Sequence, residues 1–193
     1  STPSNSSAAS DVYKRQADVD AVILAIGSSP ITIKLEGMDK LQHASAPEVL
    51  RHEVCPKGKV AVIGGGLVGL ETADTLATDG CDVTVLEMKD EIGSDLGSLR
   101  KIAVMMKLQQ MQVKMLPNSK VCKFTEEGIV LEDETLVPCN CAVFAVGFAS
   151  NDSHLLVEEC EKRQIPCRVI GDAKSARRAL DAIAEGFEAA RTL

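Results

Sequence analysis

The chain has 193 residues, of which 45% are apolar and 3% aromatic, so it can form one large or two small domains with an aliphatic core. Its formal net charge of −7 argues against nucleic acid or an anionic membrane as a partner. No apolar run approaches the roughly 20 residues that cross a bilayer. The polar start is not followed directly by an apolar segment, so we expect no signal peptide.

The cysteines are seven in number, scattered, and never arranged as CxxC, which argues against a redox-active dithiol or a zinc knuckle. Cys81, Cys122 and Cys141 lie in or beside apolar strand-like runs, where a thiol is usually a small core residue. Cys139 and Cys141 form a CxC that a strand would point to one face, but two further ligands for a structural metal site are missing nearby. We therefore expect reduced thiols in a cytoplasmic protein, and no metal.

The first segment, residues 1–16, reads STPSNSSAASDVYKRQ, is rich in Ser and lacks periodicity. This composition predicts a disordered or non-native leader outside the fold. Its end, DVYKRQ, resembles a translated sequencing-adaptor scar. We therefore expect the chain to be the C-terminal piece of a longer protein.

An apolar run at residues 21–26 predicts a short buried strand that ends at Gly27. Residues 31–58 are mixed in character and interrupted by Pro, with a short helix expected near residues 46–52. The stretch from Lys59 to Glu87 then reads as a strand, a glycine turn, a helix near residues 67–78 and a second strand that ends in an acid. This order is typical of a dinucleotide-binding unit.

Each glycine of the turn has a separate physical role. Gly64 permits a tight turn out of the strand, Gly66 lets a pyrophosphate approach the backbone, and Gly69 lets the helix pack close to the sheet. The N–H groups and the positive dipole end of the helix would then hold the phosphates. The candidate nucleotide-binding residues of this turn are Gly64, Gly65, Gly66, Leu67, Val68 and Gly69.

Glu87 lies 18 positions after Gly69, near the spacing expected for the acid that binds an adenosine ribose. A carboxylate there can accept hydrogen bonds from both ribose hydroxyls and would repel a 2′-phosphate, which favours NADH over NADPH. Lys89 weakens this preference, because its cation could swing toward a phosphate. The alternative is a glycine-rich turn in another α/β protein, with Glu87 a surface acid.

A second helix is expected at residues 98–110, followed by strands at residues 113–116, 120–125 and 128–131. Its inward residues would be Leu99, Ile102, Ala103 and Met106. A last apolar run at residues 141–146 ends at Gly147, and a final helix at residues 176–192 follows Gly171 and Asp172. Its apolar face would carry Leu180, Ile183, Ala184 and Phe187.

Two apolar strings, AVILAIG at residues 21–27 and AVFAVG at residues 142–147, both end in Ala-x-Gly and flank the nucleotide unit. This echo favours one domain inserted into another, with glycine-bearing turns at both crossings. The inner domain would span residues 56–147, and the outer one residues 17–55 and 148–193. Coincidence between short apolar strings is the alternative.

Four motifs occur in order: VILAIGSSP, VIGGGLVGLE with Glu87, VFAVG, and VIGDAKSARRALDAIAEGFEAA. Residues 17–193 thereby resemble the C-terminal half of the pyridine-nucleotide disulfide oxidoreductase superfamily of flavoproteins. The last motif is most similar to the NADH:flavin oxidoreductase group, which includes dienoyl-CoA reductase, enoate reductases and trimethylamine dehydrogenase. The resemblance implies an α/β fold, with a Rossmann-like nucleotide-binding domain inserted in a partial FAD-binding domain.

The resemblance also implies two cofactors, FAD and NADH. Ala25, Gly27 and Gly147 would be cofactor-binding strand exits, the first two near FAD. Gly171 and Asp172 would lie by the FAD ribityl-phosphate, with Asp172 accepting a hydrogen bond from a ribityl hydroxyl and the helix from residue 176 aimed at the flavin. A Gly-Asp turn that caps an ordinary helix is the alternative.

Glu71 matches a common acidic position of the family, although it could equally be a first-turn acid that favours the helix dipole. The family's first GxGxxG is absent, as are an FMN-bearing barrel and a cysteine cluster for an iron–sulfur centre. FMN and such a cluster would belong to an upstream part. No catalytic residue is assigned, because residues His43, His52 and His154 form no nucleophile–base arrangement in the sequence.

We therefore expect an oxidoreductase fragment: the electron-input module of an NADH-dependent flavin oxidoreductase, which passes hydride from NADH to FAD. Its partners would be the dinucleotide and an upstream flavin or substrate domain of the same protein. The alternatives are an NADH oxidase or ferredoxin-reductase-like flavoprotein, and a catalytically inert nucleotide-binding fragment.

Overall fold

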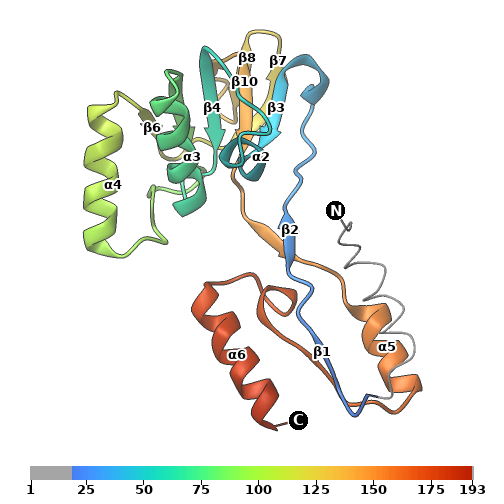
Figure 1. Ribbon diagram of the computed structural model, residues 1–193. Helices are drawn as coiled ribbons and strands as arrows, with labels where there is room; N and C mark the ends of the chain where they lie inside the picture. Colours follow the sequence, from blue (N-terminus) through green and yellow to red (C-terminus); the bar gives the residue numbers. More distant parts are fainter. Residues whose placement is uncertain (1–18, 193) are drawn as a thin grey trace, which may run out of the picture. The chain divides into compact units, whose positions relative to one another are not determined.

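The computed structural model describes residues 19–192, so the leader expected at residues 1–16 lies outside the described residues. The chain forms two compact units (Figure 1). Unit 1 comprises Ser1–Ser29 and Ala149–Leu193, and unit 2 comprises Pro30–Phe148. Unit 2 is thus inserted between the two segments of unit 1 along the chain.

Unit 2 is built around a five-stranded parallel sheet, which confirms the predicted α/β class. Side chains along β4 alternate between the two faces of this sheet. Val60 and Val62 belong to one core cluster, and Ala61 and Ile63 belong to the other. Both faces are buried, as parallel sheets require. The strands are, in spatial order, β3 (Gln42–Ser45), β10 (Cys141–Phe144), β4 (Lys59–Ile63), β5 (Asp82–Leu86) and β6 (Lys114–Leu116).

Helices cover one face of this sheet. Leu70 and Leu76 of α3 are at most 1% exposed and pack with the valines of β4 and β5. Burying a leucine side chain stabilises the fold by about 1.5–3 kcal/mol. The helices of unit 2 are η1 (Met38–Lys40), α2 (Ala46–Leu50), α3 (Leu67–Thr78) and α4 (Ser98–Gln110), so the predicted bounds of the helices at 67–78 and 98–110 are confirmed.

A small antiparallel sheet covers the other face. Phe124 and Ile129 of this sheet are at most 2% exposed and pack against Ala61 and Ala142 of the parallel sheet. The small sheet thus supplies the second core cluster of unit 2. Its strands are β7 (Val121–Thr125), β8 (Gly128–Leu131) and β9 (Leu136–Pro138), the last of which the sequence analysis did not predict.

The predicted inward face of α4 is wrong. Leu99, Ile102 and Met106 are 84%, 57% and 56% exposed, Ala103 is exposed too, and α4 instead buries Leu108. The side of α4 that turns inward carries Val104, Met105 and Leu108, which pack in the core cluster on the helix side of the sheet, and two largely exposed ion pairs also join α4 to α3. In these pairs Arg100 lies 2.8 Å from Glu71 and Lys107 lies 2.6 Å from Asp74.

Unit 1 contains a smaller parallel sheet than unit 2. Strands β1 (Val22–Leu24) and β12 (Cys167–Val169) form a two-stranded parallel sheet. It also contains α5 (His154–Lys162), η2 (Gly171–Ala173) and α6 (Ala179–Thr192). The sequence analysis missed α5 and placed the start of α6 at residue 176. The structure begins α6 at Ala179 because the preceding residues are tied to η2.

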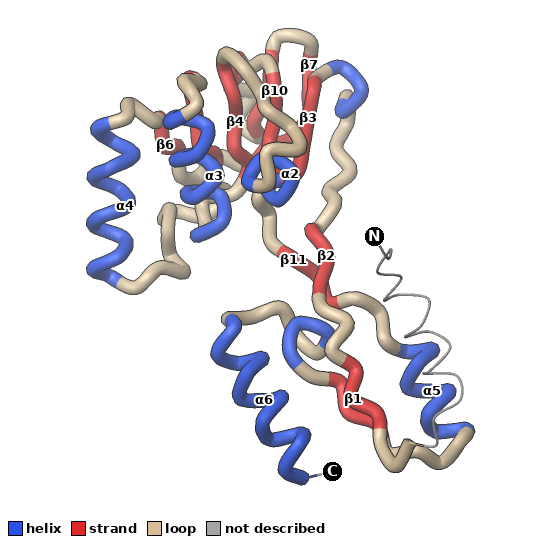
Figure 2. The backbone as a smooth tube through the Cα atoms, in the orientation of Figure 1, coloured by secondary structure: helices blue, strands red, loops and turns tan. Residues whose placement is uncertain are grey.

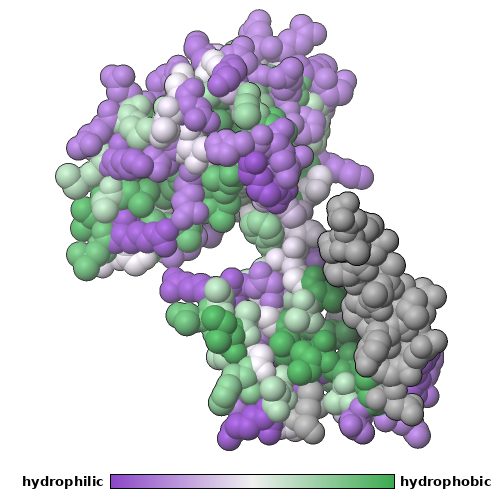
Figure 3. Space-filling model, viewed as in Figure 1, coloured by the Kyte–Doolittle hydropathy of each residue, from purple (hydrophilic) through white to green (hydrophobic). Residues whose placement is uncertain are grey.

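The apolar face of α6 exists as predicted but is not covered in the described structure. Leu180, Ile183 and Phe187 are 76%, 66% and 71% exposed, although they share one side of the helix. Figure 3 shows apolar surface over α6 and over part of α4. Both helices therefore present large apolar side chains to solvent.

The chain crosses between the units on two short strands. Gly27, with φ +74°, precedes β2 (Ser28–Pro30), and Gly147, with φ +99°, precedes β11 (Phe148–Ser150). These strands pair with one another (Figure 2). The structure divides the chain at Pro30 rather than near residue 55, because β3 joins the edge of the parallel sheet and α2 packs against its core.

The cysteines of the CxC do not share a face as predicted. Cys139 packs in the cluster under the small sheet and Cys141 in the cluster under the helices, because β10 begins only at Cys141. Cys122, expected in the core, is exposed. Within residues 19–192, no group of three or more His, Cys, Asp or Glu side chains could hold a metal ion. No helix in this range is long and apolar enough to cross a membrane.

Candidate nucleotide-binding site

The carboxyl ends of β4 and β5 meet at one edge of the parallel sheet. Ile63 is paired with Leu86, and the Gly64 N–H donates to the Leu86 carbonyl at 2.8 Å. The glycine turn and Glu87 are therefore neighbours, although Gly65 and Glu87 lie 22 positions apart in the sequence. Ligands of open α/β sheets bind outside this end of the strands.

Two glycines of the turn are required by close packing. Gly64 has φ +111°, and a Cβ on it would lie 2.4 Å from the Ala145 carbonyl oxygen. A Cβ on Gly69 would lie 1.9 Å from the Gly64 carbonyl oxygen. No side chain fits at these separations, so the two glycines allow the sharp turn and the close approach of α3 to the sheet.

Gly66 has a different role, because its φ of −77° and ψ of −175° suit any residue. A Cβ there would lie 3.1 Å from Asp95 Oδ2, a side-chain atom that can move. The Leu67 N–H donates to both oxygens of Asp95, at 3.1 and 3.0 Å. A carboxylate thus occupies the N-terminus of α3, where the helix dipole and free N–H groups favour an anion.

Glu87 lies directly after β5 and is only 9% exposed. Its Oε2 accepts a hydrogen bond from Gly65 N–H at 2.7 Å, and its Oε1 accepts one from Lys89 N–H at 2.9 Å. Backbone donors therefore hold the carboxylate beside the glycine turn. A carboxylate oxygen can accept more than one hydrogen bond, so these contacts leave acceptor capacity.

The other two predicted residues of α3 face away from the turn. Val68 packs against the core cluster on the helix side of the sheet. The side chain of Glu71 is 46% exposed and pairs with Arg100 of α4. In this structure Glu71 therefore connects two helices.

Unit 1 brings four of the predicted flavin residues together. Ala25, Gly27, Gly171 and Asp172 line one cavity of about 320 Å³. Gly147 lies in unit 2, where its carbonyl accepts a hydrogen bond from Ile31 N–H at 3.0 Å. Gly147 and the other strand exit, Gly27, thus belong to different units.

Asp172 is half-buried and held from two sides. One oxygen accepts a hydrogen bond from Ser28 Oγ at 3.1 Å, and the other accepts one from Arg177 N–H at 3.2 Å. These contacts connect the loop before α6 to the exit of β1. They position the carboxylate at the cavity wall.

Glu185 of α6 fastens the same loop, which the sequence analysis did not anticipate. Its Oε2 accepts a hydrogen bond from Gly171 N–H at 2.7 Å, and its Oε1 pairs with Arg177 and Lys174. The hydrogen bond from Arg177, the Gly171 N–H and Lys174 lower the pKa of Glu185 to about 2. Glu185 is therefore ionised at neutral pH and orients Gly171 and Asp172.

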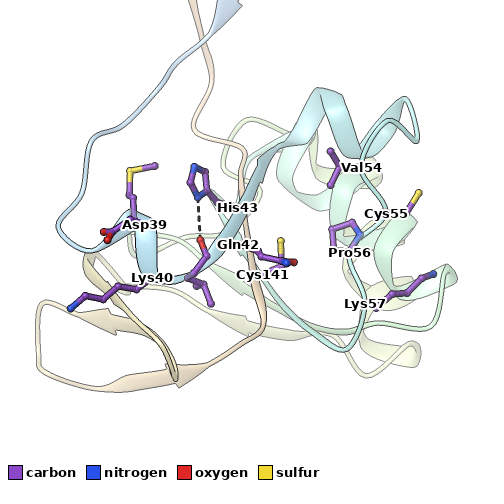
Figure 4. Close-up of a pocket in the computed structure, with 11 residues that line it drawn as sticks. Asp39, Lys40, Gln42, His43, Val54, Cys55, Pro56, Lys57 and Cys141 are labelled. Carbon is purple, nitrogen blue, oxygen red and sulfur yellow. Dashed lines mark hydrogen bonds between the residues drawn. The ribbon is translucent and has the colours of Figure 1, made fainter.

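A different cavity of about 680 Å³ lies at the opposite end of the parallel sheet (Figure 4). Gln42 and Cys141, which begin β3 and β10, line it together with His43. His43 Nδ1 lies 3.2 Å from the Leu41 carbonyl oxygen, to which it can donate. This cavity is at the amino ends of the strands, so the glycine turn does not contribute to it.

Comparison with known proteins identifies the family. Residues 5–173 match the family described as pyridine nucleotide-disulphide oxidoreductase. The chain is 36% identical over 181 residues to a bilirubin reductase from Mediterraneibacter gnavus, covering 90% of this chain and 28% of that protein. It is 35% identical over 194 residues to a cinnamate reductase from Clostridium sporogenes, covering 96% and 28%.

A solved structure shares the fold. A 2-naphthoyl-CoA reductase in complex with 2-naphthoyl-CoA superposes with a TM-score of 0.79 at 24% identity, covering 90% of this chain and 27% of that one. The chain therefore spans a little over a quarter of the length of these relatives. The resemblance inferred from the four sequence motifs is confirmed, and the chain belongs to the pyridine nucleotide-disulphide oxidoreductase family, whose enzymes use FAD and NADH.

Proposed function

We propose that this chain is the electron-input module of an NADH-dependent flavin oxidoreductase. The observation that carries this proposal is the glycine turn of unit 2, joined to Glu87 at the carboxyl ends of β4 and β5. Unit 2 would hold the nicotinamide nucleotide, and unit 1 would contribute to the flavin site. When bound, the two cofactors supply the chemistry, a hydride transfer from nicotinamide C4 to flavin N5.

The glycine turn fits a dinucleotide. Gly66 offers space without a Cβ, and the Leu67 N–H is already engaged by an anion in the form of the Asp95 carboxylate. A pyrophosphate oxygen would use the same donor and the dipole of α3. Glu87, fixed by two backbone N–H groups, would accept hydrogen bonds from the adenosine ribose through its remaining lone pairs.

The cavity of unit 1 fits part of a flavin cofactor. Gly27 leaves open space, because nothing lies within 4 Å of a Cβ built on it. Asp172 would accept a hydrogen bond from a ribityl hydroxyl, while Glu185 and Arg177 keep its loop in place. At about 320 Å³, the cavity is suited to one end of FAD and not to the whole molecule.

Titration of NADH against the Gly66→Val variant tests the site. The backbone of Gly66 tolerates valine, so the domain should stay folded while nucleotide binding is lost. Gly97→Val is the matched control, because Gly97 is also the N-cap of a helix, has extended backbone and has nothing within 4 Å of a Cβ. Unchanged NADH affinity in folded Gly66→Val would overturn the assignment.

The electron-transfer role needs a separate measurement. A diaphorase assay with NADH, added FAD and a dye acceptor distinguishes a working module from a nucleotide-binding fragment without turnover. Dye reduction that depends on both cofactors supports the module, whereas NADH binding without dye reduction supports the inert fragment. We propose the upstream flavin or substrate domain of the same protein as the natural electron acceptor. We also propose a cytoplasmic location, since the seven cysteines are free thiols.

A further inference from the structure

The phosphate end of the candidate nucleotide site is occupied by a side chain of the protein itself. Asp95 lies in the segment between β5 and α4, and both of its oxygens accept the Leu67 N–H at the start of α3. Its Oδ2 also lies beside Gly66, 3.1 Å from the position that a Cβ there would take. The carboxylate therefore takes both features of the turn that a pyrophosphate would use: the backbone donor and the open approach.

The segment around Asp95 is firmly attached to the same turn. Ile92 is 5% exposed and packs in the core cluster under the helices. The Gly93 N–H donates to the Gly65 carbonyl at 2.7 Å. Leu96 is half-buried against that cluster, and its N–H donates to the Gly93 carbonyl at 3.2 Å. Asp95 is thus presented to α3 from an anchored segment, while its own side chain remains exposed to solvent.

We propose that Asp95 is a built-in competitor of the dinucleotide's pyrophosphate, and that binding requires its side chain to rotate away from α3. This inference rests on the proposed function. One N–H cannot serve a carboxylate and a phosphate oxygen fully at once, and two anions at one helix end repel each other. Rotation of the Asp95 side chain frees the donor without moving Ile92 or Gly93, because these two are held through the core and the backbone.

The competition has a consequence for selectivity. A ligand must gain enough binding free energy from its other contacts to displace the Asp95 carboxylate from the N-terminus of α3. A dinucleotide can do so through its ribose and base, whereas a small anion such as inorganic pyrophosphate gains only the helix end. Asp95 would thereby lower the affinity for every phosphate ligand and exclude the weak ones from the site.

Glu91 provides a matched control in the same segment. Its side chain is 62% exposed and its carboxylate pairs with Lys101, and in the described structure no hydrogen bond or ion pair joins it to the glycine turn. The Glu91→Gln variant removes one negative charge from the segment without opening the N-terminus of α3. It therefore separates general electrostatics from direct competition.

The experiment is a calorimetric titration of NADH, and of inorganic pyrophosphate, into the wild-type chain, Asp95→Asn, Asp95→Ala and Glu91→Gln. Both Asp95 variants should bind NADH about fivefold more tightly, because a charged hydrogen bond no longer has to be broken. Inorganic pyrophosphate should bind measurably only to them. The NADH affinity of Glu91→Gln should stay within about twofold of the wild-type value, as expected for loss of a surface charge.

Thermal unfolding without ligand gives the second readout. Loss of Asp95 removes a partner of the α3 N-terminus, so the ligand-free variants should melt at a slightly lower temperature while binding NADH more tightly. A purely structural role predicts the same loss of stability but equal or weaker NADH binding, and that result would overturn the proposal. If neither wild type nor any variant binds NADH, the proposed function falls as well. If wild type binds NADH and the Asp95 variants bind it no better, only this inference falls.

Discussion

The two units of this chain differ in how completely they bury their apolar residues. In unit 2, helices cover one face of the parallel sheet and a small antiparallel sheet covers the other, so two core clusters form. In the described part of unit 1, the buried apolar residues are only Leu24, Cys160, Ala173 and Ala189. The apolar side of α6 is exposed there, including Phe187 at 71%.

This difference indicates which functions each unit can support. The turn around Gly64 is fixed on all sides by β5, by Glu87 and by the segment that carries Asp95, so its donors are pre-organised. The cavity of unit 1 instead depends on two hydrogen bonds, one from Gly171 N–H to Glu185 and one from Ser28 Oγ to Asp172. Pre-organised sites bind with a smaller entropy cost, so we expect unit 2 to hold its nucleotide better than unit 1 holds a flavin.

The largest expected effect concerns FAD. The purified chain should not retain FAD through gel filtration, because the residues that we propose for the flavin, Asp172 and the loop before α6, would contact only its ribityl and flavin end. Losing the remaining contacts costs at least about 4 kcal/mol, or roughly a thousandfold in affinity. The visible spectrum of the protein peak gives the measurement, and a stoichiometric yellow cofactor would show that the site of unit 1 is complete.

The next prediction compares a glycine-to-alanine substitution in each of the two units. Gly69→Ala should destabilise unit 2 by about 2–3 kcal/mol, because its Cβ would be forced onto the Gly64 carbonyl oxygen. Gly186→Ala in α6 should stabilise unit 1 by about 0.5–1 kcal/mol, since the added Cβ meets only Ile170 at 3.8 Å and alanine favours a helix. Urea unfolding followed by circular dichroism measures both. Equal effects would mean that the two glycines are not differently packed.

A smaller effect concerns nucleotide choice in unit 2. Wild type should bind NADH better than NADPH, and Glu87→Gln should narrow the ratio of the two dissociation constants by about tenfold, or 1.4 kcal/mol. The amide retains an acceptor for a backbone N–H but no longer repels a 2′-phosphate. Glu71→Gln is the control, because Glu71 pairs with Arg100 on the helix surface. Similar affinities for both nucleotides in wild type would contradict the role of Glu87.

The smallest effect concerns thiol reactivity. Burial raises the pKa of Cys139 and of Cys141 to about 11, so at pH 8 few of these groups are reactive thiolates. Exposed Cys55 and Cys122 should be alkylated first. In mild urea, Cys160 of unit 1 should react before the two buried thiols of unit 2, because its unit is less fully covered. Mass spectrometry of alkylated peptides orders these events, and simultaneous labelling would show that both units open together.

The sequence by itself determined the β4–α3–β5 unit, including the bounds of α3 and the place of Glu87. This was possible because the relevant interactions are local: apolar periodicity, glycine conformation and a short spacing decide that unit. The four ordered motifs also identified the family. The internal echo at Gly27 and Gly147 indicated an inserted unit with glycine turns at its crossings.

Only the tertiary structure decided which residues meet across long stretches of chain. Asp95 reaches Leu67 over 28 positions and Ser28 reaches Asp172 over 144, and no local pattern encodes such contacts. The inward face of α4 was mispredicted for the same reason, since Val104, Met105 and Leu108 meet the core cluster of unit 2, whereas the predicted apolar stripe stays exposed. Periodicity shows which residues share a side of a helix, but burial depends on a partner surface that other parts of the chain provide.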